Sequence, residues 1–365
     1  MDLAFLFRYA IISRTICRMG ADQAAAVLRA LGFCLKGERR MRRLLRVFLT
    51  LLWALSLCAC QDAPRQVTSF ALDTVCTVTV YRGQDEQAGR DALAEVDIQE
   101  ARLSRYITGS EMDQLNQDGS LALDASLESL FLLAQRVNVL TDGAFDITLG
   151  RISDLWNFTA PQPQIPDAEA LEKALSSSGM ACLTLQDGQA VLTKDALVDL
   201  GGIAKGYIAM QAAQFLRGQD VESAIVNLGG NVVLIGQRPG GGDYRVGVQK
   251  PFEPNGTLIA TIAEQDCSVV TSGVYQRCFE LDGVRYHHVL DPATGYPAQT
   301  DLLSATVVCQ DAAYADALST AFLILGKARA LALAQQLEGV EALFVDENMR
   351  VSYTDGLAGK VEIMP

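Results

Sequence analysis

Residues 199–206 read Asp-Leu-Gly-Gly-Ile-Ala-Lys-Gly. This stretch is typical of a strand end that turns through two glycines into a helix. Such a turn exposes backbone amide and carbonyl groups to which a phosphate or a metal ion can bind, and Lys205 adds a positive charge. It is neither a Walker loop nor a G-x-G-x-x-G fingerprint. Taken alone, it is equally typical of an ordinary glycine-rich connection.

Strand and helix patterns alternate on both sides of this turn. Period-two and β-branched patterns predict strands over 75–81, 223–228, 232–235, 267–271, 277–281, 286–290, 305–309, 342–345 and 350–353, with a hairpin arm over 190–200. Apolar residues at helical spacing predict helices over 88–104, 127–137, 167–178, 203–216, 312–325 and 328–337. Adjacent strand pairs argue against a purely parallel sheet, so we expect a mixed α/β (α+β) class.

Charge is unevenly distributed along the chain. The 365 residues include 30 Lys and Arg against 43 Asp and Glu, which gives a formal net charge of −13. Residues 1–60 hold ten of the basic and three of the acidic residues, so the remainder has a formal charge of −20. Such a body repels nucleic acid, which argues against a nucleic-acid partner. A polyanionic small ligand would need a metal ion or backbone dipoles to be held here.

The N-terminal region has the pattern of a bacterial secretory signal. Arginines between Arg39 and Arg46 precede an apolar run over 47–59, and the sequence then reaches Cys60. A basic region, a short apolar core and a small residue before the cut are typical of a signal peptide. The run is shorter than the ~20 residues of a membrane-spanning helix. Because Leu57-Cys58-Ala59-Cys60 resembles a lipobox, we expect Cys60 to be lipidated and to anchor the protein on the extracytoplasmic face of the cell membrane.

This pattern divides the chain into four segments. Met41 opens a complete signal, so we interpret residues 1–40 as a gene-model extension, with a long basic leader as the alternative. We interpret residues 41–59 as the signal peptide, 60–66 as a tether and 67–365 as a single domain.

The cysteines beyond Cys60 give little support to a disulfide framework or a zinc site. They are odd in number and have no C-x-x-C spacing. We expect buried free thiols at Cys76, Cys182, Cys267, Cys278 and Cys309.

The segment Asp316-Ala-Leu-Ser-Thr320 places a carboxylate and a hydroxyl at helical spacing. Residues four apart on a helix share a face, so Asp316 and Thr320 project their oxygens together. Two such oxygens suit a hard cation that keeps several waters. For an isolated pair, a solvated polar face is the simpler interpretation.

The two histidines of the chain are adjacent, at His287 and His288, ahead of the turn Asp291-Pro-Ala-Thr-Gly295. Neighbouring strand residues face opposite sides, so we expect at most one histidine to reach a site. A Ser-His-Asp hydrolase using Ser272 and Asp291 is conceivable, but the chain has no G-x-S-x-G elbow. A structural, hydrogen-bonding histidine is the alternative.

Taken together and in this order, the segments resemble the ApbE family of FAD:protein FMN transferases, from about Phe70 to Gly326. The resemblance implies a T-fold-related α/β domain with a barrel-like core and flanking helices. It also implies a Mg²⁺-dependent reaction in which FAD is split, FMN is esterified through its phosphate to a threonine of another protein, and AMP is released. The implied acceptors are Rnf- or Nqr-type subunits of ion-pumping redox complexes and exported flavoprotein reductases.

The resemblance also implies roles for individual residues. Asp316 and Thr320 match metal-binding side chains, and the Gly202 carbonyl matches the third protein ligand. His288 matches a histidine that touches the dinucleotide, and together with Asp316 it is our catalytic candidate. The implied flavin-binding residues are Leu72, Tyr106, Ala144, Phe145, Asp146, Asp199, Lys205 and His288. Leu72 departs from the family pattern, which has Met there, but it can fill the same apolar role.

Phosphoryl transfer needs charge neutralisation and in-line positioning more than a strong nucleophile. We therefore expect Mg²⁺ on Asp316, Thr320 and Gly202 to bridge the FAD pyrophosphate, and Asp316 or a water on the metal to accept the threonine proton. Two other functions stay open: an FAD pyrophosphatase with water as acceptor, and a non-catalytic flavin-binding or solute-binding lipoprotein. The Asp316/Thr320 pair argues against the last, because binding alone needs no metal.

Overall fold

An eight-stranded antiparallel sheet organises the described part of the chain, residues 64–82, 86–193 and 195–365 of a computed structural model. The strand order is β1-β2-β6-β7-β10-β13-β14-β15. These strands are β1 (Arg65–Ala71), β2 (Thr74–Arg82), β6 (Ser223–Leu228), β7 (Asn231–Ile235), β10 (Ser268–Gly273), β13 (Leu302–Cys309), β14 (Glu341–Asp346) and β15 (Val351–Tyr353). The order has two ends, so these strands form an open sheet, which is the core of the expected sheet-and-helix fold.

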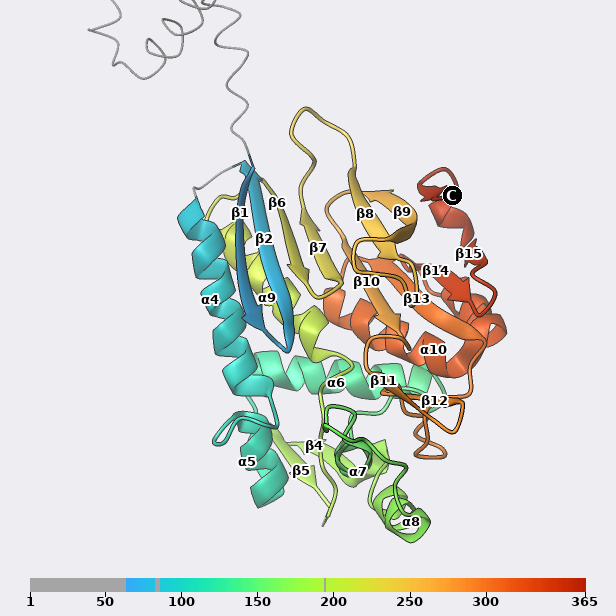
Figure 1. The fold of residues 1–365 in the computed structure, drawn as a ribbon. Coiled ribbons are helices and arrows are strands. Elements are labelled where there is room, and N and C mark those ends of the chain that lie inside the picture. The colour runs from blue at the N-terminus through green and yellow to red at the C-terminus, as the bar shows by residue number, and fades with distance from the viewer. Residues whose placement is uncertain (1–63, 83–85, 194) are drawn as a thin grey trace, which may run out of the picture. The chain divides into compact units, whose positions relative to one another are not determined.

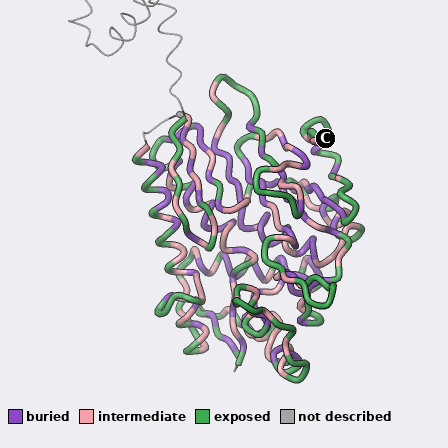
Figure 2. The backbone as a smooth tube through the Cα atoms, viewed as in Figure 1, coloured by how far each residue is buried: buried purple, intermediate pink, exposed green. Residues whose placement is uncertain are grey.

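Helices cover one face of this sheet (Figure 1). They are α4 (Glu86–Leu103), α9 (Ala204–Gly218) and α10 (Ala312–Ala334), and α6 (Ala125–Leu140) packs against α10 below the strands. Their apolar faces join the inward residues of the sheet in the largest core, which is the buried centre visible in Figure 2. α10 contains Gly326 at φ 73°, so it is two helical pieces, as the sequence predicts. Among the described helices only α10 is long and apolar enough to cross a membrane, and here it packs within the core.

A second, three-stranded sheet covers part of the opposite face. It consists of β8 (Tyr244–Gln249), β9 (Leu258–Glu264) and β16 (Val361–Ile363), in the order β16-β9-β8. Its apolar residues pack on outward residues of β7, β10, β13 and β14, such as Leu234, Val269 and Leu343. The covered half of the main sheet is therefore buried on both faces.

A third group of elements lies beyond the end of β1 and β2. It contains α5 (Glu111–Asp118), β3 (Ser120–Ala122), α7 (Gly150–Trp156), α8 (Ala168–Ser176), a 3-10 turn (Met180–Cys182), β4 (Leu183–Gln186), β5 (Gln189–Leu192) and the hairpin β11 (Cys278–Leu281)–β12 (Val284–His287). Trp156 anchors this group: its ring contacts Phe158, Phe279, Tyr286 and Tyr296, and its Nε1 donates to the Gly295 carbonyl at 2.7 Å. This contact holds the turn that follows His288 against α7.

The mixed α/β class is confirmed, but several local predictions are wrong. β1 begins at Arg65, so the last two residues of the expected tether belong to the sheet. The expected arm over 190–200 is a strand only to Leu192, and β12 ends at His287 rather than at residue 290. All five described cysteines are free, but Cys278 is exposed and Cys182 is half-buried. The expected signal, the expected lipidation site Cys60 and residues 1–40 lie outside the described residues.

Candidate active site

A cleft of about 1670 Å³ lies where the β1–β2 turn, the 199–206 turn and the N-terminal half of α10 meet. It exceeds the ~300–1,000 Å³ of pockets that bind drug-sized ligands, so it has room for a ligand as large as a dinucleotide. Every residue that the resemblance singled out for flavin or metal lines this cleft: Leu72, Tyr106, Ala144, Phe145, Asp146, Asp199, Gly202, Lys205, His288, Asp316 and Thr320. Segments separated by more than 200 residues in the sequence thus share one cavity.

The 199–206 turn is built from local hydrogen bonds. The Asp199 carboxylate accepts the Gly201 amide at 2.9 Å, which closes the turn, and the Ala204 amide donates to the Leu200 carbonyl at 2.8 Å as α9 begins. A Cβ on Gly202 would lie 3.2 Å from the Phe145 ring and 3.6 Å from the Thr320 hydroxyl. The turn therefore lies directly against α10 and the Phe145 segment.

Asp316 joins the first turn of α9 to α10. Its side chain is buried, and its Oδ2 accepts the Gly206 amide at 2.8 Å. Burial raises the pKa of the Asp316 carboxyl, while the nearby Lys205 ammonium and the Gly206 amide act in the opposite direction. A buried carboxylate with a single charged neighbour is costly, so a cation at this position would be stabilising.

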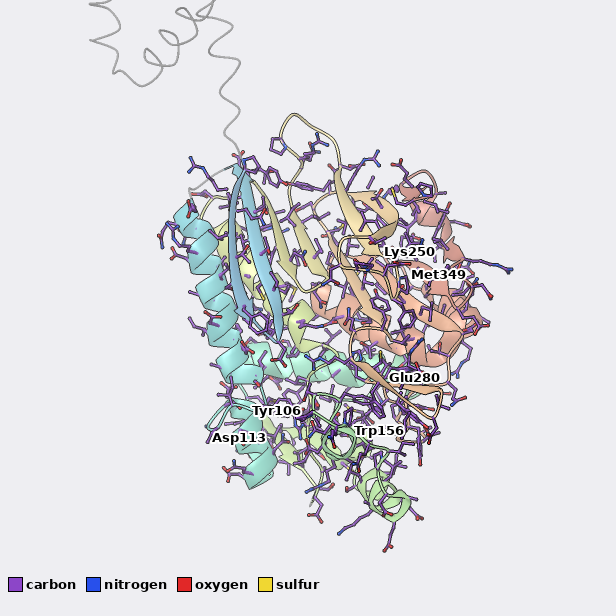
Figure 3. The ribbon with its side chains drawn as sticks, in the orientation of Figure 1. Tyr106, Asp113, Trp156, Lys250, Glu280 and Met349 are labelled. Atoms are coloured by element: carbon purple, nitrogen blue, oxygen red, sulfur yellow. The ribbon has the colours of Figure 1, made fainter. Side chains whose placement is uncertain are left out.

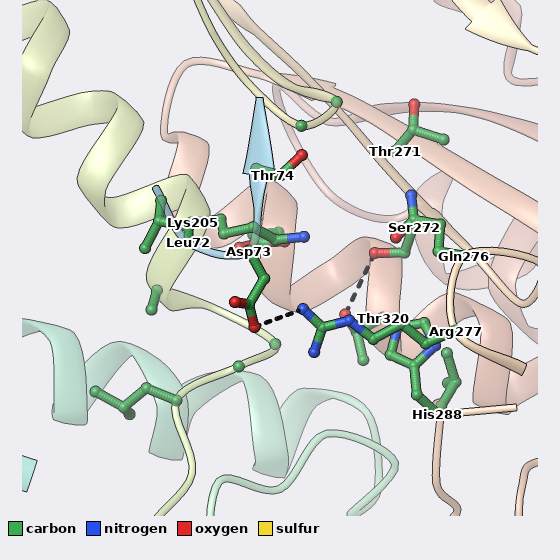
Figure 4. A pocket seen from close by; sticks show the side chains of 18 of the residues that line it. Leu72, Asp73, Thr74, Lys205, Thr271, Ser272, Gln276, Arg277, His288 and Thr320 are labelled. Atoms are coloured by element: carbon green, nitrogen blue, oxygen red, sulfur yellow. Dashed lines mark hydrogen bonds and ion pairs between the residues drawn. The ribbon is translucent and has the colours of Figure 1, made fainter. Parts of the chain in front are cut away.

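The donor set around Asp316 fits a hard divalent cation. The Asp316 carboxylate, the Thr320 hydroxyl and the Gly202 carbonyl are all oxygen donors, the type that Mg²⁺ binds while keeping waters or substrate phosphates. The Ser272 hydroxyl lies 2.8 Å from the Ser319 hydroxyl and 3.4 Å from that of Thr320, so it fixes this part of α10 (Figure 4). Within the described ranges no cluster of three His, Cys, Asp or Glu side chains could hold a metal ion, and Asp316 is the one carboxylate among the three expected donors.

Of the two histidines, only His288 lines the cleft, and His287 points into the protein. The His288 amide donates to the Arg277 carbonyl at 3.0 Å, but among the described residues its buried Nδ1 has no hydrogen-bond partner. Burial, with the charges of Lys205 and Arg277, lowers the pKa of His288 to about 3. Its imidazole is therefore neutral at physiological pH. Ser272 bonds to α10 and not to His288, which argues against a Ser-His-Asp triad.

Asp146 lines the cleft, but its carboxylate is used structurally. Its Oδ1 accepts the amide and the hydroxyl of Thr148 at 2.7 and 2.6 Å, and Thr148 in turn accepts the Gly179 amide. Burial raises the pKa of Asp146, and these hydrogen bonds oppose that change. The residue therefore shapes the wall formed by Ala144 and Phe145.

The β1–β2 turn places Leu72 and Asp73 at the cleft. Both have positive φ, 54° and 55°, in a two-residue turn of the kind that joins hairpin strands. A leucine rarely adopts this conformation, so surrounding contacts must hold it. The Leu72 amide donates to Glu100 at 2.9 Å, and Asp73 forms an ion pair with Arg277 at 3.3 Å across the cleft (Figure 4).

Arg105 was not predicted from the sequence as a site residue. It organises the wall of the cleft that contains Tyr106 and Asp199. Its guanidinium is nearly buried and makes two bonds to Asp154, at 2.9 and 2.8 Å. It also donates to the Tyr106 hydroxyl at 2.8 Å and lies 3.7 Å from Asp199. Tyr106 lies beside this group, below the main sheet in Figure 3. Two features of the sequence could have indicated Arg105: it is a cation in a strongly acidic body, and it directly precedes Tyr106, which the resemblance singled out.

Comparisons with known proteins identify the family of this chain. The model of the ApbE family matches residues 72–344. The chain belongs to the ApbE family. The FAD:protein FMN transferase of Treponema pallidum is 34% identical over 316 residues, which cover 80% of this chain and 87% of that protein. The FAD:protein FMN transferase of Haemophilus influenzae is 30% identical over 317 residues, which cover 81% and 91%.

Solved ApbE structures share the fold. The ApbE protein of Thermotoga maritima superposes with a TM-score of 0.75 at 32% identity, covering 82% of this chain and 99% of that one. The flavin transferase ApbE of Vibrio cholerae gives a TM-score of 0.73 at 26% identity, covering 82% and 100%. The predicted family, fold class and enzyme class, a transferase, are confirmed.

Proposed function

We propose that this chain is an FAD:protein FMN transferase that attaches FMN to a threonine of another protein and releases AMP. One observation carries the proposal: the eleven residues singled out for FAD and metal all line one cleft. The names of the relatives support the same activity. The threonine acceptor, AMP release and Mg²⁺ dependence are the finer parts of the proposal.

In the proposed reaction, the threonine oxygen forms a bond to the phosphorus of the FMN half of FAD. The bond from that phosphorus to the bridging oxygen breaks, and AMP leaves with that oxygen. The threonine proton passes to the Asp316 carboxylate or to a water beside it, which acts as the general base. Mg²⁺ bound by Asp316, Thr320 and Gly202 would supply positive charge to the diphosphate.

Other residues of the cleft bind and orient the dinucleotide. His288 is neutral, so its imidazole offers one hydrogen bond without adding charge. Lys205 brings a positive charge to the same wall as His288 and Asp316. Leu72 and Phe145 supply apolar surface, and the Arg105 network holds Tyr106 and Asp199 in place. These contacts keep the reacting phosphorus in line with the incoming hydroxyl.

A single incubation separates this function from its alternatives. The purified protein is mixed with FAD, Mg²⁺ and the soluble flavin-carrying domain of an Rnf-type complex, and then AMP, free FMN and in-gel flavin fluorescence are measured. A transferase gives AMP and a fluorescent acceptor. AMP with free FMN indicates a pyrophosphatase, and no AMP indicates a binder.

The role of Asp316 predicts the effect of its substitution. Asp316→Ala should lower FMN transfer at least 100-fold, because it removes the proton acceptor and the only carboxylate of the donor set. The circular dichroism spectrum should be retained. Full activity of this variant with Mg²⁺ would falsify the assigned role.

We further propose that the protein is lipid-anchored through Cys60 on the extracytoplasmic face of a bacterial membrane. The support is the arginine-rich, apolar and Leu-x-Ala-Cys pattern before the domain. There the protein would act on exported acceptors of the Rnf or Nqr type or on exported flavoprotein reductases.

A further inference from the structure

The main sheet is covered unevenly on the face opposite the helices. The small sheet β8-β9-β16 packs on β7, β10, β13 and β14, and it reaches only Tyr81 at the far end of β2 and Ile225 of β6. Towards the β1–β2 turn, no described element lies over β1 and β2 on this face (Figure 1). This uncovered part of the sheet lies beside the candidate active site, so another molecule can bind to it.

The register identifies the side chains on this face. Val67, Cys76 and Val78 pack towards the helices, so the alternate residues point outward. Phe70 pairs with Val75, Thr68 with Thr77, and Thr77 with Asn227 of β6. We call these outward residues the neutral face: Thr68, Phe70, Val75, Thr77, Thr79 and Asn227.

The composition of the neutral face is unlike that of the rest of the body. None of its six residues is charged, in a body whose formal charge is −20. Phe70 is 73% exposed and Val75 is 57% exposed, and the two are directly paired across the strands. Protein interfaces are depleted of charge and enriched in aromatic residues at their centre. An uncharged face also avoids the repulsion that an acidic body exerts on an acidic partner.

The neutral face continues into the cleft. Val75, Thr77 and Asn227 belong to both, and Phe70 is two residues from Leu72 at the β1–β2 turn. On another side of the cleft, Tyr106 and Ile107 are also exposed apolar residues that line it. A chain segment lying across this face can therefore deliver one of its residues to the reacting phosphorus.

We propose that the neutral face docks the acceptor protein, through a weakly charged segment that flanks its threonine. The inference rests on the proposed function, because only a transferase must seat a second protein at this cleft. The acceptor is the occupant favoured here because the face is continuous with the cleft in which its threonine would react. FAD binds inside the cleft and does not need Phe70 or Thr68.

The test uses substitutions that leave the cleft intact. Phe70→Asp and Thr68→Asp place a charge on the neutral face outside the cleft lining. Val139→Asp on α6 is the matched control, because Val139 is 81% exposed and does not line the cleft. The acceptor probes are the soluble flavin-carrying domain of an Rnf-type complex and an exported flavoprotein reductase, whichever the wild type labels.

The expected result is a KM for the acceptor at least 10-fold higher for Phe70→Asp and several-fold higher for Thr68→Asp. The FAD affinity and the melting temperature should stay at wild-type values, and Val139→Asp should leave all three quantities unchanged. An unchanged acceptor KM, an equal loss of FAD affinity, or an equal effect of Val139→Asp overturns the proposal while the transferase function stands.

Other occupants give different results. If Phe70→Asp converts a dimer to a monomer in size-exclusion chromatography, or abolishes sedimentation with phosphatidylglycerol vesicles, while the acceptor KM is unchanged, the face belongs to a second copy or to a membrane. If the wild type releases AMP but labels neither probe, the transferase function fails and the docking inference fails with it.

Discussion

Arg105 shows how one side chain can hold a whole wall of the cleft. Its guanidinium bonds both Asp154 oxygens, the Gly150 carbonyl and the Tyr106 hydroxyl, and it lies close to Asp199. A lysine has the same charge but not the planar fork that makes these contacts together. The arrangement of Tyr106 and Asp199 therefore depends on the shape of this group as well as on its charge.

Arg105→Lys should weaken FAD binding about 10-fold, because losing one or two charge-assisted hydrogen bonds costs about 1–3 kcal/mol. A fluorescence titration of FAD measures this change. Arg151→Lys is the control, since Arg151 contacts the exposed Asp195 and does not line the cleft. Equal FAD affinities for the two variants would show that Arg105 does not position the wall.

The half-buried His288 predicts a pH dependence of stability. Its pKa is about 3 in the fold against 6.5 for an ordinary histidine, because burial and the neighbouring Lys205, Arg277 and His287 disfavour the cation. Below pH 6.5 the unfolded chain binds a proton at this position and the native protein does not. The wild type therefore loses about 1.4 kcal/mol per pH unit from this residue as the pH falls towards 3.

His288→Gln removes this contribution while leaving the other titrating groups in place. Between pH 7.5 and 5, the wild-type free energy of unfolding should fall by about 2 kcal/mol relative to the variant. Urea denaturation without FAD or metal measures it at each pH. A difference that does not change with pH would mean that the His288 imidazole is protonated as readily in the fold as in the unfolded chain.

At the residue scale, the sequence identified residues that line the cleft. It did not identify the hydrogen bonds and ion pairs that those residues make. Ordered motifs singled out residues such as Gly202 and His288, all of which the structure places around one cavity. The contacts that hold them were not predictable, because they join distant segments. Asp73 and Arg277 are 204 residues apart, and Arg105 and Asp154 are 49 apart.

Between elements, the contact of α9 with α10 determines the geometry of the donor set. Gly206 in the first turn of α9 lies against the backbone of Ala312, and its amide bonds Asp316. A Cβ at Gly206 would lie 2.0 Å from the Ala312 carbonyl oxygen and 2.7 Å from the Asp316 Cβ. Only a glycine permits this approach of the two helices.

Gly206→Ala should lower the free energy of unfolding by about 3 kcal/mol, since the helices must separate. Gly218→Ala in the same helix is the matched control, because a Cβ there meets nothing within 4 Å. That variant should gain up to about 1 kcal/mol from helix propensity. Chemical denaturation compares the two, and similar values would mean that α9 and α10 are not packed as described.

Long elements with a continuous apolar pattern were predicted from the sequence. Short helices, and a strand with few apolar residues, were not. α6, α9 and β6 match their predicted ranges within a few residues, because each carries a continuous apolar pattern. α5 and α7 have eight and seven residues, which is too short for a helical period to be recognised. β1 was missed because its outward residues are Gln66, Thr68 and Phe70, so that only its inner residues follow the core pattern.

At the scale of the whole molecule, the sequence predicts that the N-terminal segment determines where the protein is located and that the folded unit carries out the reaction. The described residues from 64 to 365 form one compact unit that contains every residue of the cleft, whereas the lipobox pattern ends earlier in the sequence, at Cys60. The net charge follows the same division, since residues 1–60 are net basic and the remainder is net acidic. Changing the anchor should therefore move the enzyme without changing its reaction.

Cys60→Ala should shift the protein from the membrane pellet to the soluble extracytoplasmic fraction, because it removes the thiol that we expect to carry the lipid. AMP release from FAD with the purified variant should equal that of the wild type. Cys58→Ala is the control, since Cys58 follows the bulky Leu57 and is not the expected lipidation site. Fractionation with a radiolabelled fatty acid distinguishes the two. If Cys58→Ala is the variant that loses the label, the lipid is on the other cysteine, and if neither loses it, the membrane association has another source.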